Sequence, residues 1–203
     1  MVKQSEIMME SEGDAWFSRN RHKLGARDPV SEVIDELALV PTSVLEVGAA
    51  DGWRLAKLRD RYGCKVLGID PSMAACNAAA TRGVPMYQMT ANGLPVDDKS
   101  IDMLIYGFCL YLTDPADWLR IAAEGDRVLK DGGHLIVHDF SEAFPVHARQ
   151  YEHRDGVLSY HHDFSRLWLG HPLYHIISQR SLPTDEMVTV LLKRPANAIE
   201  VRP

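Results

Sequence analysis

The segment of residues 44–52, VLEVGAADG, constrains the fold of this chain more than any other. Val44 to Val47 form a short aliphatic run that is typical of a buried parallel strand. Small residues and glycines follow, and residues 53–62 then predict a helix with its apolar side chains on one face. The glycines let a ligand approach the backbone, and the start of the helix offers unpaired N–H groups. This order is typical of a nucleotide site in an α/β sheet.

A second aliphatic run, residues 65–69, ends in Asp70, where such sites place a carboxylate for ribose hydroxyls. Glu46 stands two residues before Gly48, and Gly52 completes an E-x-G-x-x-x-G pattern that differs from the G-x-G-x-x-G of NAD enzymes. With Asp70, this pattern resembles the first two motifs of class I S-adenosylmethionine-dependent methyltransferases of the small-molecule, methyltransferase-11-like type. A structural turn in another doubly wound domain is the alternative.

Three later segments agree with this resemblance. Residues 90–95, TANGLP, resemble the D-A-E-x-L-P segment that borders adenine in small-molecule methyltransferases, with Thr90 in place of the leading aspartate. Residues 98–106 fit the family's F-D-x-V-x strand, and residues 127–140 fit its R-V-L-K-x-G-G motif and the strand that follows. The resemblance covers residues 42–140. It implies an α/β fold, a Rossmann-like, seven-stranded methyltransferase sandwich with a mostly parallel sheet and a closing antiparallel hairpin.

The clearest helix of the chain lies between the last two of these segments. Asp114 is a natural N-cap, and Pro115 fits the first helical position. Residues 130–133, KDGG, are expected to end this helix before the fifth strand begins.

One methyltransferase domain is expected over residues 1–203, because about two hundred residues suffice for one core and are few for two. Residues 1–40 are expected to supply lid helices after a frayed start of about twelve residues. Residues 42–140 are expected to form the cofactor-binding core. A cover for the acceptor site is expected in residues 141–175, and the closing hairpin in residues 174–194.

The resemblance implies S-adenosylmethionine as the cofactor. The contacts that it implies come from the glycine turn and from the ends of the predicted strands: Glu46, Gly48, Ala49, Gly52, Asp70, Pro71, Ser72, Met73, Thr90, Ala91, Asn92 and Tyr106. Trp16 and Arg19 would join them from the lid. The alternative for the lid is that Trp16 and Phe17 only pack a helix onto the domain.

Methyl transfer from a sulfonium is an in-line displacement, which a dry, apolar-walled site favours. A hydroxyl acceptor also benefits from a general base. The candidates are His138, Asp139, Tyr111, His161 and His162. Enzymes of this type that need no base are the alternative. Eight of the nine histidines lie between His134 and His175, but their spacing is not that of a metal site, so no metal is expected.

The net charge of −6 and the absence of a long basic run make a nucleic-acid partner unexpected. No apolar stretch suits a signal peptide or a membrane span, and the three cysteines form no C-x-x-C pair, so a cytoplasmic location is expected. The oligomeric state is left open.

The sequence thus predicts methyl transfer to an oxygen or nitrogen of a small-molecule acceptor, such as a sugar or another secondary metabolite. Three alternatives remain. They are a methyltransferase for RNA or protein, a catalytically silent fold used as a binding module, and an NAD dehydrogenase.

Overall fold

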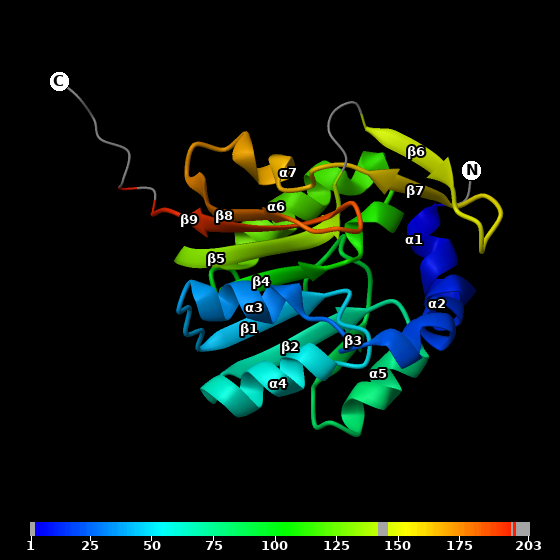
Figure 1. The fold of residues 1–203 in the computed structure, drawn as a ribbon, viewed down its shortest axis with the longest axis horizontal. Coiled ribbons are helices and arrows are strands. Elements are labelled where there is room, and N and C mark those ends of the chain that lie inside the picture. Colours follow the sequence, from blue (N-terminus) through cyan, green and yellow to red (C-terminus); the bar gives the residue numbers. More distant parts are fainter. Residues whose placement is uncertain (1–2, 142–145, 196, 198–203) are drawn as a thin grey trace.

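A computed structural model describes residues 3–141, 146–195 and 197 of the chain. Its centre is a seven-stranded sheet with the order β3-β2-β1-β4-β5-β9-β8 (Figure 1). The strands that pair in parallel are β1 (Ser43–Val47), β2 (Lys65–Asp70), β3 (Met86–Gln88), β4 (Ile101–Gly107) and β5 (Leu129–Phe140). An antiparallel hairpin of β8 (Tyr174–Ser181) and β9 (Glu186–Lys193) pairs with β5. The predicted α/β fold with its closing hairpin is confirmed.

Helices and short turns connect the strands (Figure 1). They are α3 (Pro29–Glu36), α4 (Trp53–Tyr62), α5 (Met73–Ala80), the 3-10 turns η3 (Leu110–Leu112) and η4 (Pro115–Asp117), α6 (Trp118–Val128) and α7 (Arg166–Leu169).

Alternate residues of the central strands enter two hydrophobic layers, because successive side chains of a strand point to opposite faces of the sheet. Leu45 and Leu104 enter the layer that contains residues of α6. Val44 and Met103 enter the layer that contains residues of α3 and α4. The central strands are therefore buried on both faces, as their continuous aliphatic runs predict.

The first residues form α1 (Gln4–Ile7), the π-helical turn η1 (Met8–Glu12), α2 (Gly13–Asn20) and the 3-10 turn η2 (Arg21–Lys23). The prediction of a frayed start is therefore wrong. Gln4 is buried, and its side-chain amide donates to the carbonyl oxygens of Leu112, at 3.0 Å, and Leu158, at 3.1 Å. Its Oε1 atom accepts the N–H of Leu158 at 2.6 Å. These hydrogen bonds join residues far apart in the sequence, so a local pattern does not reveal them.

The helix after β4 begins later than predicted. Pro115 starts η4, and α6 begins at Trp118. The carboxylate of Asp114 accepts the backbone N–H of Gln4 at 2.9 Å and makes no side-chain cap. Residues 130–133 belong to β5 rather than to a helix end, and the pairing of β4 with β5 changes register between Ile101 and Met103.

A separate two-stranded antiparallel sheet contains β6 (His147–Gln150) and β7 (Leu158–His161). In Figure 1 these yellow strands lie beside the dark blue α1, and the hydrogen bonds between Gln4 and Leu158 join the two segments. Residues 1–2 of the predicted lid, residues 142–145 of the predicted cover, and residues 196 and 198–203 of the predicted domain lie outside the described residues.

Candidate active site

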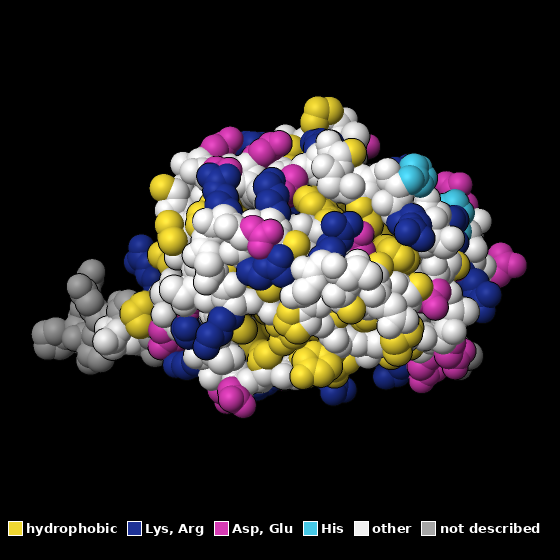
Figure 2. Space-filling model, turned by 90° about the horizontal axis from the view of Figure 1, so that it is seen from below, with side chains coloured by type: hydrophobic (Ala, Val, Ile, Leu, Met, Phe, Trp, Pro, Cys, Tyr) yellow, Lys and Arg dark blue, Asp and Glu magenta, His cyan; other side chains and the backbone are white. Residues whose placement is uncertain are grey.

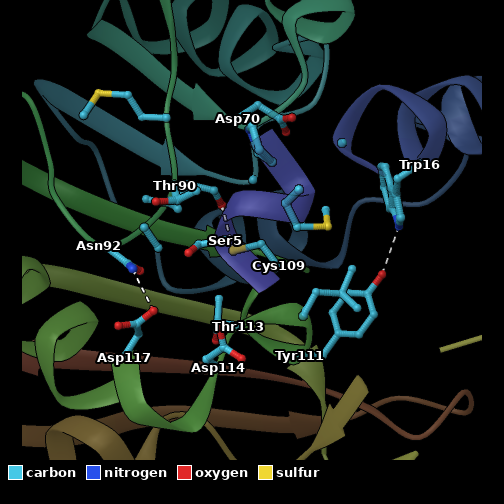
Figure 3. Close-up of a pocket in the computed structure, with 18 of the residues that line it drawn as sticks. Ser5, Trp16, Asp70, Thr90, Asn92, Cys109, Tyr111, Thr113, Asp114 and Asp117 are labelled. Atoms are coloured by element: carbon cyan, nitrogen blue, oxygen red, sulfur yellow. Dashed lines mark hydrogen bonds between the residues drawn. The ribbon is translucent and has the colours of Figure 1, made fainter. Parts of the chain in front are cut away.

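A pocket lies where the parallel strands end, which is where ligands bind in open α/β sheets. It encloses about 760 Å³, part of it open to solvent. Residues that follow β1 to β4 line it together with residues of the N-terminal helices (Figure 3). The lining residues include Ser5, Met8, Gly13, Trp16, Gly48, Asp70, Pro71, Thr90, Ala91, Asn92, Phe108, Cys109, Tyr111, Asp114 and Asp117.

The glycine turn forms one wall of this pocket. Gly48 has a φ of +76°, and a Cβ atom added to it would lie 2.6 Å from the Cβ of Cys109. Only glycine adopts this conformation readily and leaves that space free. Gly52 directly precedes α4, has a φ of +67° and packs against Val84, away from the lining. Ala49 is buried in the layer beneath α3 and α4.

Asp70 lies at the end of β2 and faces the pocket. Its carboxylate accepts the N–H groups of Ala50 and Ser72, each at 2.9 Å. Burial raises the pKa of Asp70 to about 6. Two backbone hydrogen bonds fix the carboxylate, which keeps further lone pairs for a ligand hydroxyl.

The residues after Asp70 divide between the pocket and α5. Pro71 lines the pocket. The hydroxyl of Ser72 instead caps α5, where it accepts the N–H of Ala75 at 3.0 Å and donates to Asp14 at 2.6 Å. Met73 is 45% exposed and lies outside the lining. The turn into α5 therefore directs the side chains of Ser72 and Met73 away from the cavity.

Thr90, Ala91 and Asn92 follow β3 and line the side of the pocket opposite Trp16 (Figure 3). The side-chain amide of Asn92 donates from Nδ2 to Oδ2 of Asp117 at 2.8 Å. Asp117 lines the pocket and is 8% exposed. A local sequence pattern does not reveal this role of Asp117, because its partner lies 25 residues earlier in the chain.

The N-terminal helices cover the outer side of the pocket. Ser5, Met8, Gly13 and Trp16 contribute to the lining, and the indole Nε1 of Trp16 donates to the hydroxyl of Tyr111 at 2.9 Å (Figure 3). Of these four residues, the sequence singles out Trp16 alone. The polar pattern around the other three gives no local sign of a pocket.

Phe17 and Arg19 lie away from the cavity. Phe17 is buried against Ala50 and Ala75. Arg19 forms an ion pair with Glu12 and donates to the hydroxyl of Tyr151 at 3.1 Å. Phe17 thus packs α2 onto the domain, while Trp16 faces the cavity.

Glu46 and Tyr106 also lie outside the pocket lining. Glu46 is buried and forms an ion pair with Arg54, and burial raises the pKa of Glu46 to about 6. Tyr106 is fully buried, and its ring centroid lies 5.2 Å from that of Trp168. Its hydroxyl donates to the carbonyl oxygen of Ile121 at 3.3 Å. The alternation of side chains along β4 turns Tyr106 towards α6.

The five catalytic candidates occupy different surroundings. Tyr111 is the one that lines the pocket in the described part of the chain. His161 stacks on Phe140 with centroids 4.3 Å apart, and His162 stacks on Trp118 at 5.9 Å. The structure thus does not bring these two histidines together with Tyr111 at the cavity.

His138 and Asp139 lie behind the pocket wall. His138 is 8% exposed, and its Nε2 atom lies 2.9 Å from an Oε2 atom of Glu186. Asp139 is buried and accepts the N–H of Leu110 at 2.7 Å and that of Tyr111 at 3.3 Å. Burial raises the pKa of Asp139 to about 7. Asp139 therefore fixes the backbone that carries Tyr111.

The thiol of Cys109 faces the pocket, but burial raises its pKa well above the ordinary value, which favours the unreactive thiol over the thiolate. Among the residues described, no group of three or more His, Cys, Asp and Glu side chains is arranged to hold a metal ion. No helix within those residues has the length and apolarity needed to cross a membrane.

Known methyltransferase sequences are similar to part of this chain. Residues 45–137 match the family model described as a methyltransferase domain. Malonyl-[acyl-carrier protein] O-methyltransferase 1 of Coxiella burnetii is 33% identical over 110 residues, which are 54% of this chain and 37% of that protein. Demethylmenaquinone methyltransferase of Tropheryma whipplei is 34% identical over 102 residues, which are 48% of this chain and 41% of that protein. The chain thus covers about two fifths of the length of these relatives.

Solved structures share the fold. The 1,6-didemethyltoxoflavin-N1-methyltransferase of Burkholderia thailandensis, solved with 1,6-didemethyltoxoflavin and S-adenosylhomocysteine, matches with a TM-score of 0.73 and 16% identity over 95% of this chain and 87% of that one. An S-adenosylmethionine-dependent methyltransferase of Methanosarcina mazei matches with a TM-score of 0.65 and 19% identity over 80% of this chain and 97% of that one. Residues 45–137 thus match the methyltransferase-domain family, and the chain shares the fold of S-adenosylmethionine-dependent methyltransferases.

Proposed function

We propose that this chain transfers the methyl group of S-adenosylmethionine to an oxygen or nitrogen atom of a small molecule. The observation that carries the proposal is the covered pocket at the strand ends. Gly48, Asp70 and residues 90–92 supply a glycine turn, a ribose-binding carboxylate and a base-binding segment on one side. Trp16 and Tyr111 supply an aromatic wall on the other (Figure 3).

The cofactor, when bound, supplies a methyl group on a positively charged sulfur. The residues of the chain would exclude water and orient the acceptor, because an in-line displacement gains most from alignment and a dry site. Trp16, Phe108 and Tyr111 form apolar surfaces for this purpose. In this proposal residues 3–20 act as the lid, and residues 146–175 contribute to the cover of the acceptor side.

Tyr111 is the residue best placed to hold the acceptor. Burial raises the pKa of its hydroxyl well above the ordinary value, so the hydroxyl stays protonated at neutral pH. The indole of Trp16 can only donate, so the hydroxyl oxygen of Tyr111 accepts in that hydrogen bond. The Tyr111 proton is then left to donate to a lone pair of the acceptor. In this role Tyr111 orients the acceptor and is not its general base.

A small acceptor fits this site better than a macromolecule. The N-terminal helices cover the pocket, and the face of the molecule shown in Figure 2 carries basic and acidic side chains interspersed, with no continuous basic groove. The 1,6-didemethyltoxoflavin bound to the Burkholderia enzyme is a small molecule. A cytoplasmic location is part of the proposal and rests on the cysteine pattern of the sequence.

Calorimetric titration with S-adenosylmethionine and S-adenosylhomocysteine, with NAD as the control, tests the cofactor. The proposal expects micromolar binding of the first two and none of NAD. Formation of S-adenosylhomocysteine in the presence of a panel of small hydroxyl and amine compounds, sugars first, tests the transfer. Binding of neither S-adenosyl ligand would overturn the proposal, and binding without transfer to any acceptor would favour a silent binding module.

A further inference from the structure

The hydrogen bond between Asn92 and Asp117 fixes the orientation of an amide inside the pocket (Figure 3). An ionised carboxylate can only accept hydrogen bonds, so the Asn92 amide must turn its NH₂ group towards Asp117. Its carbonyl oxygen, Oδ1, then lies on the side away from Asp117. No group in the described part of the chain donates to this oxygen. The pocket therefore contains an acceptor whose direction a second residue determines.

Asp117 is itself held in place. Its backbone N–H donates to the carbonyl oxygen of Asp114 at 2.9 Å, and it directly precedes α6, an eleven-residue helix. The start of a helix favours a negative charge. Asp117 is thus held at the start of this helix, and it is only 8% exposed.

The topology indicates which part of the cofactor this acceptor meets. In the proposed function, the carboxylate of Asp70 at the end of β2 binds the ribose. The strand order places β3 beyond β2, on the side away from β1. A base attached to that ribose and directed away from Gly48 would therefore reach residues 90–92, which follow β3.

We infer that Asp117 is a positioning residue that makes the cofactor site selective for adenine. It holds the Asn92 amide so that Oδ1 accepts a hydrogen bond from the 6-amino group of the base. A base with a carbonyl oxygen at this position would place two acceptors face to face, which costs the hydrogen bond and leaves a polar atom unpaired. The pair of Asn92 and Asp117 thus supplies the selection in this chain. The inference rests on the proposed function.

The test compares S-adenosylhomocysteine with S-inosylhomocysteine, in which a carbonyl oxygen replaces the 6-amino group. The measured quantity is the ratio of their dissociation constants, obtained by calorimetry. Asp117→Asn can offer Asn92 either a donor or an acceptor, so the Asn92 amide is free to turn. We expect this variant to lower the preference for adenine by about tenfold or more.

Two further variants make the test specific. Asn92→Ala removes the acceptor itself and should lower the preference to a similar extent. Asp114→Asn is the matched control, because Asp114 also lines the pocket but accepts the N–H of Gln4 and not the amide of Asn92. Its ratio should stay within about twofold of the wild-type value. A residue that served only the stability of the protein would change both dissociation constants and leave their ratio unaltered.

The outcomes separate the inference from the proposed function. If the wild type binds S-adenosylhomocysteine but neither Asp117→Asn nor Asn92→Ala changes the ratio, the inference is wrong and the proposed function stands. If the wild type binds neither ligand, both are overturned. If Asp117→Asn does not fold, the ratio of dissociation constants measured for Asn92→Ala decides. A ratio equal to that of the wild type means that Asn92 plays no part in the selection of the base. Asp117, which acts through Asn92, then plays no part either.

Discussion

The indole nitrogen of Trp16 donates a 2.9 Å hydrogen bond to the hydroxyl of Tyr111, and this contact joins α2 to η3 at one wall of the pocket. Both side chains line the cavity. A ligand that occupies the pocket would be enclosed by this pair on one side, so the strength of the contact bears on how long the ligand stays bound.

We expect Trp16→Phe to accelerate the dissociation of S-adenosylmethionine by about three- to tenfold, because the variant keeps an aromatic surface but loses a hydrogen bond worth about 1 kcal/mol. A chase experiment with labelled cofactor measures the rate. Tyr111→Phe and the double variant complete a double-mutant cycle. In this cycle the second substitution should add little to the change in dissociation rate that the first one causes. Fully additive effects would show that the two residues act independently.

Asp70→Ala should weaken cofactor binding by at least about tenfold, because the variant loses an acceptor for the ribose hydroxyls and releases the N–H groups of Ala50 and Ser72. Calorimetry with S-adenosylhomocysteine measures the change. Asp51→Ala is the control, since Asp51 pairs with Arg82 and does not line the pocket. Unchanged affinity in Asp70→Ala would remove Asp70 from the site.

The stability of the protein should fall as the pH rises from about 4 to about 7. Burial raises the pKa of Asp139 from 3.8 in the unfolded chain to about 7 in the folded one, so in this range the folded state binds a proton that the unfolded state lacks. Each unit by which the pKa is raised corresponds to roughly 1.4 kcal/mol. Asp70 and Glu46, raised to about 6 by burial, act in the same direction.

Urea unfolding at pH 5 and pH 8 measures the free energy of unfolding at each pH. The substitution Asp139→Asn should reduce the difference between these two free energies. Asp102→Asn is the control. Although burial opposes the shift, hydrogen bonds from Lys130 and Thr42 lower the pKa of Asp102 to about 2, so its stabilising effect is lost only below about pH 4. An equal difference in wild type and Asp139→Asn would contradict the prediction.

Arg54→Met should lower the free energy of unfolding by about 3–5 kcal/mol. Arg54 forms buried ion pairs with Glu46 and with Asp28, the latter at 2.9 Å, and its loss leaves two carboxylates in the interior without this partner. Arg61→Met is the matched control, because Arg61 pairs with Asp35 at the surface, where such a pair is worth less than about 1 kcal/mol. Similar unfolding energies for the two variants would count against the buried network.

Gly48→Ala should abolish cofactor binding and destabilise the fold, because the added Cβ would lie 2.6 Å from the Cβ of Cys109 and the φ of +76° is strained for alanine. Gly63→Ala is the control: its φ is +65°, but a Cβ there meets nothing within 4 Å. It should cost only about 1 kcal/mol. Cofactor binding by Gly48→Ala at the wild-type level would show that the turn tolerates a side chain.

The sequence was sufficient for the features that depend on local patterns. The aliphatic runs, the glycine turn and the carboxylate of Asp70 all depend on residues close together in the chain, and the sheet follows from them. Tyr106 shows the limit of such reasoning. Its place near the end of β4 suggests a pocket residue, but the alternation along the strand turns its ring towards Trp168.

Contacts between distant residues could not be predicted. Gln4 lies in a polar stretch without an apolar pattern, and its role comes from partners more than 100 residues away. The hydrogen bond between Asn92 and Asp117 likewise requires that the segment after β3 and the segment after β4 lie side by side in the fold. The same holds for Asp114, which looks like a helix cap in the sequence and accepts the N–H of Gln4 in the structure.

The three hydrogen bonds of the Gln4 side chain have a kinetic consequence. They join α1 to Leu112 in η3 and to Leu158 in β7, so an outward movement of α1 breaks its contacts with both segments at once. Exchange of the cofactor and exposure of the acceptor side would then be a single event rather than two independent ones.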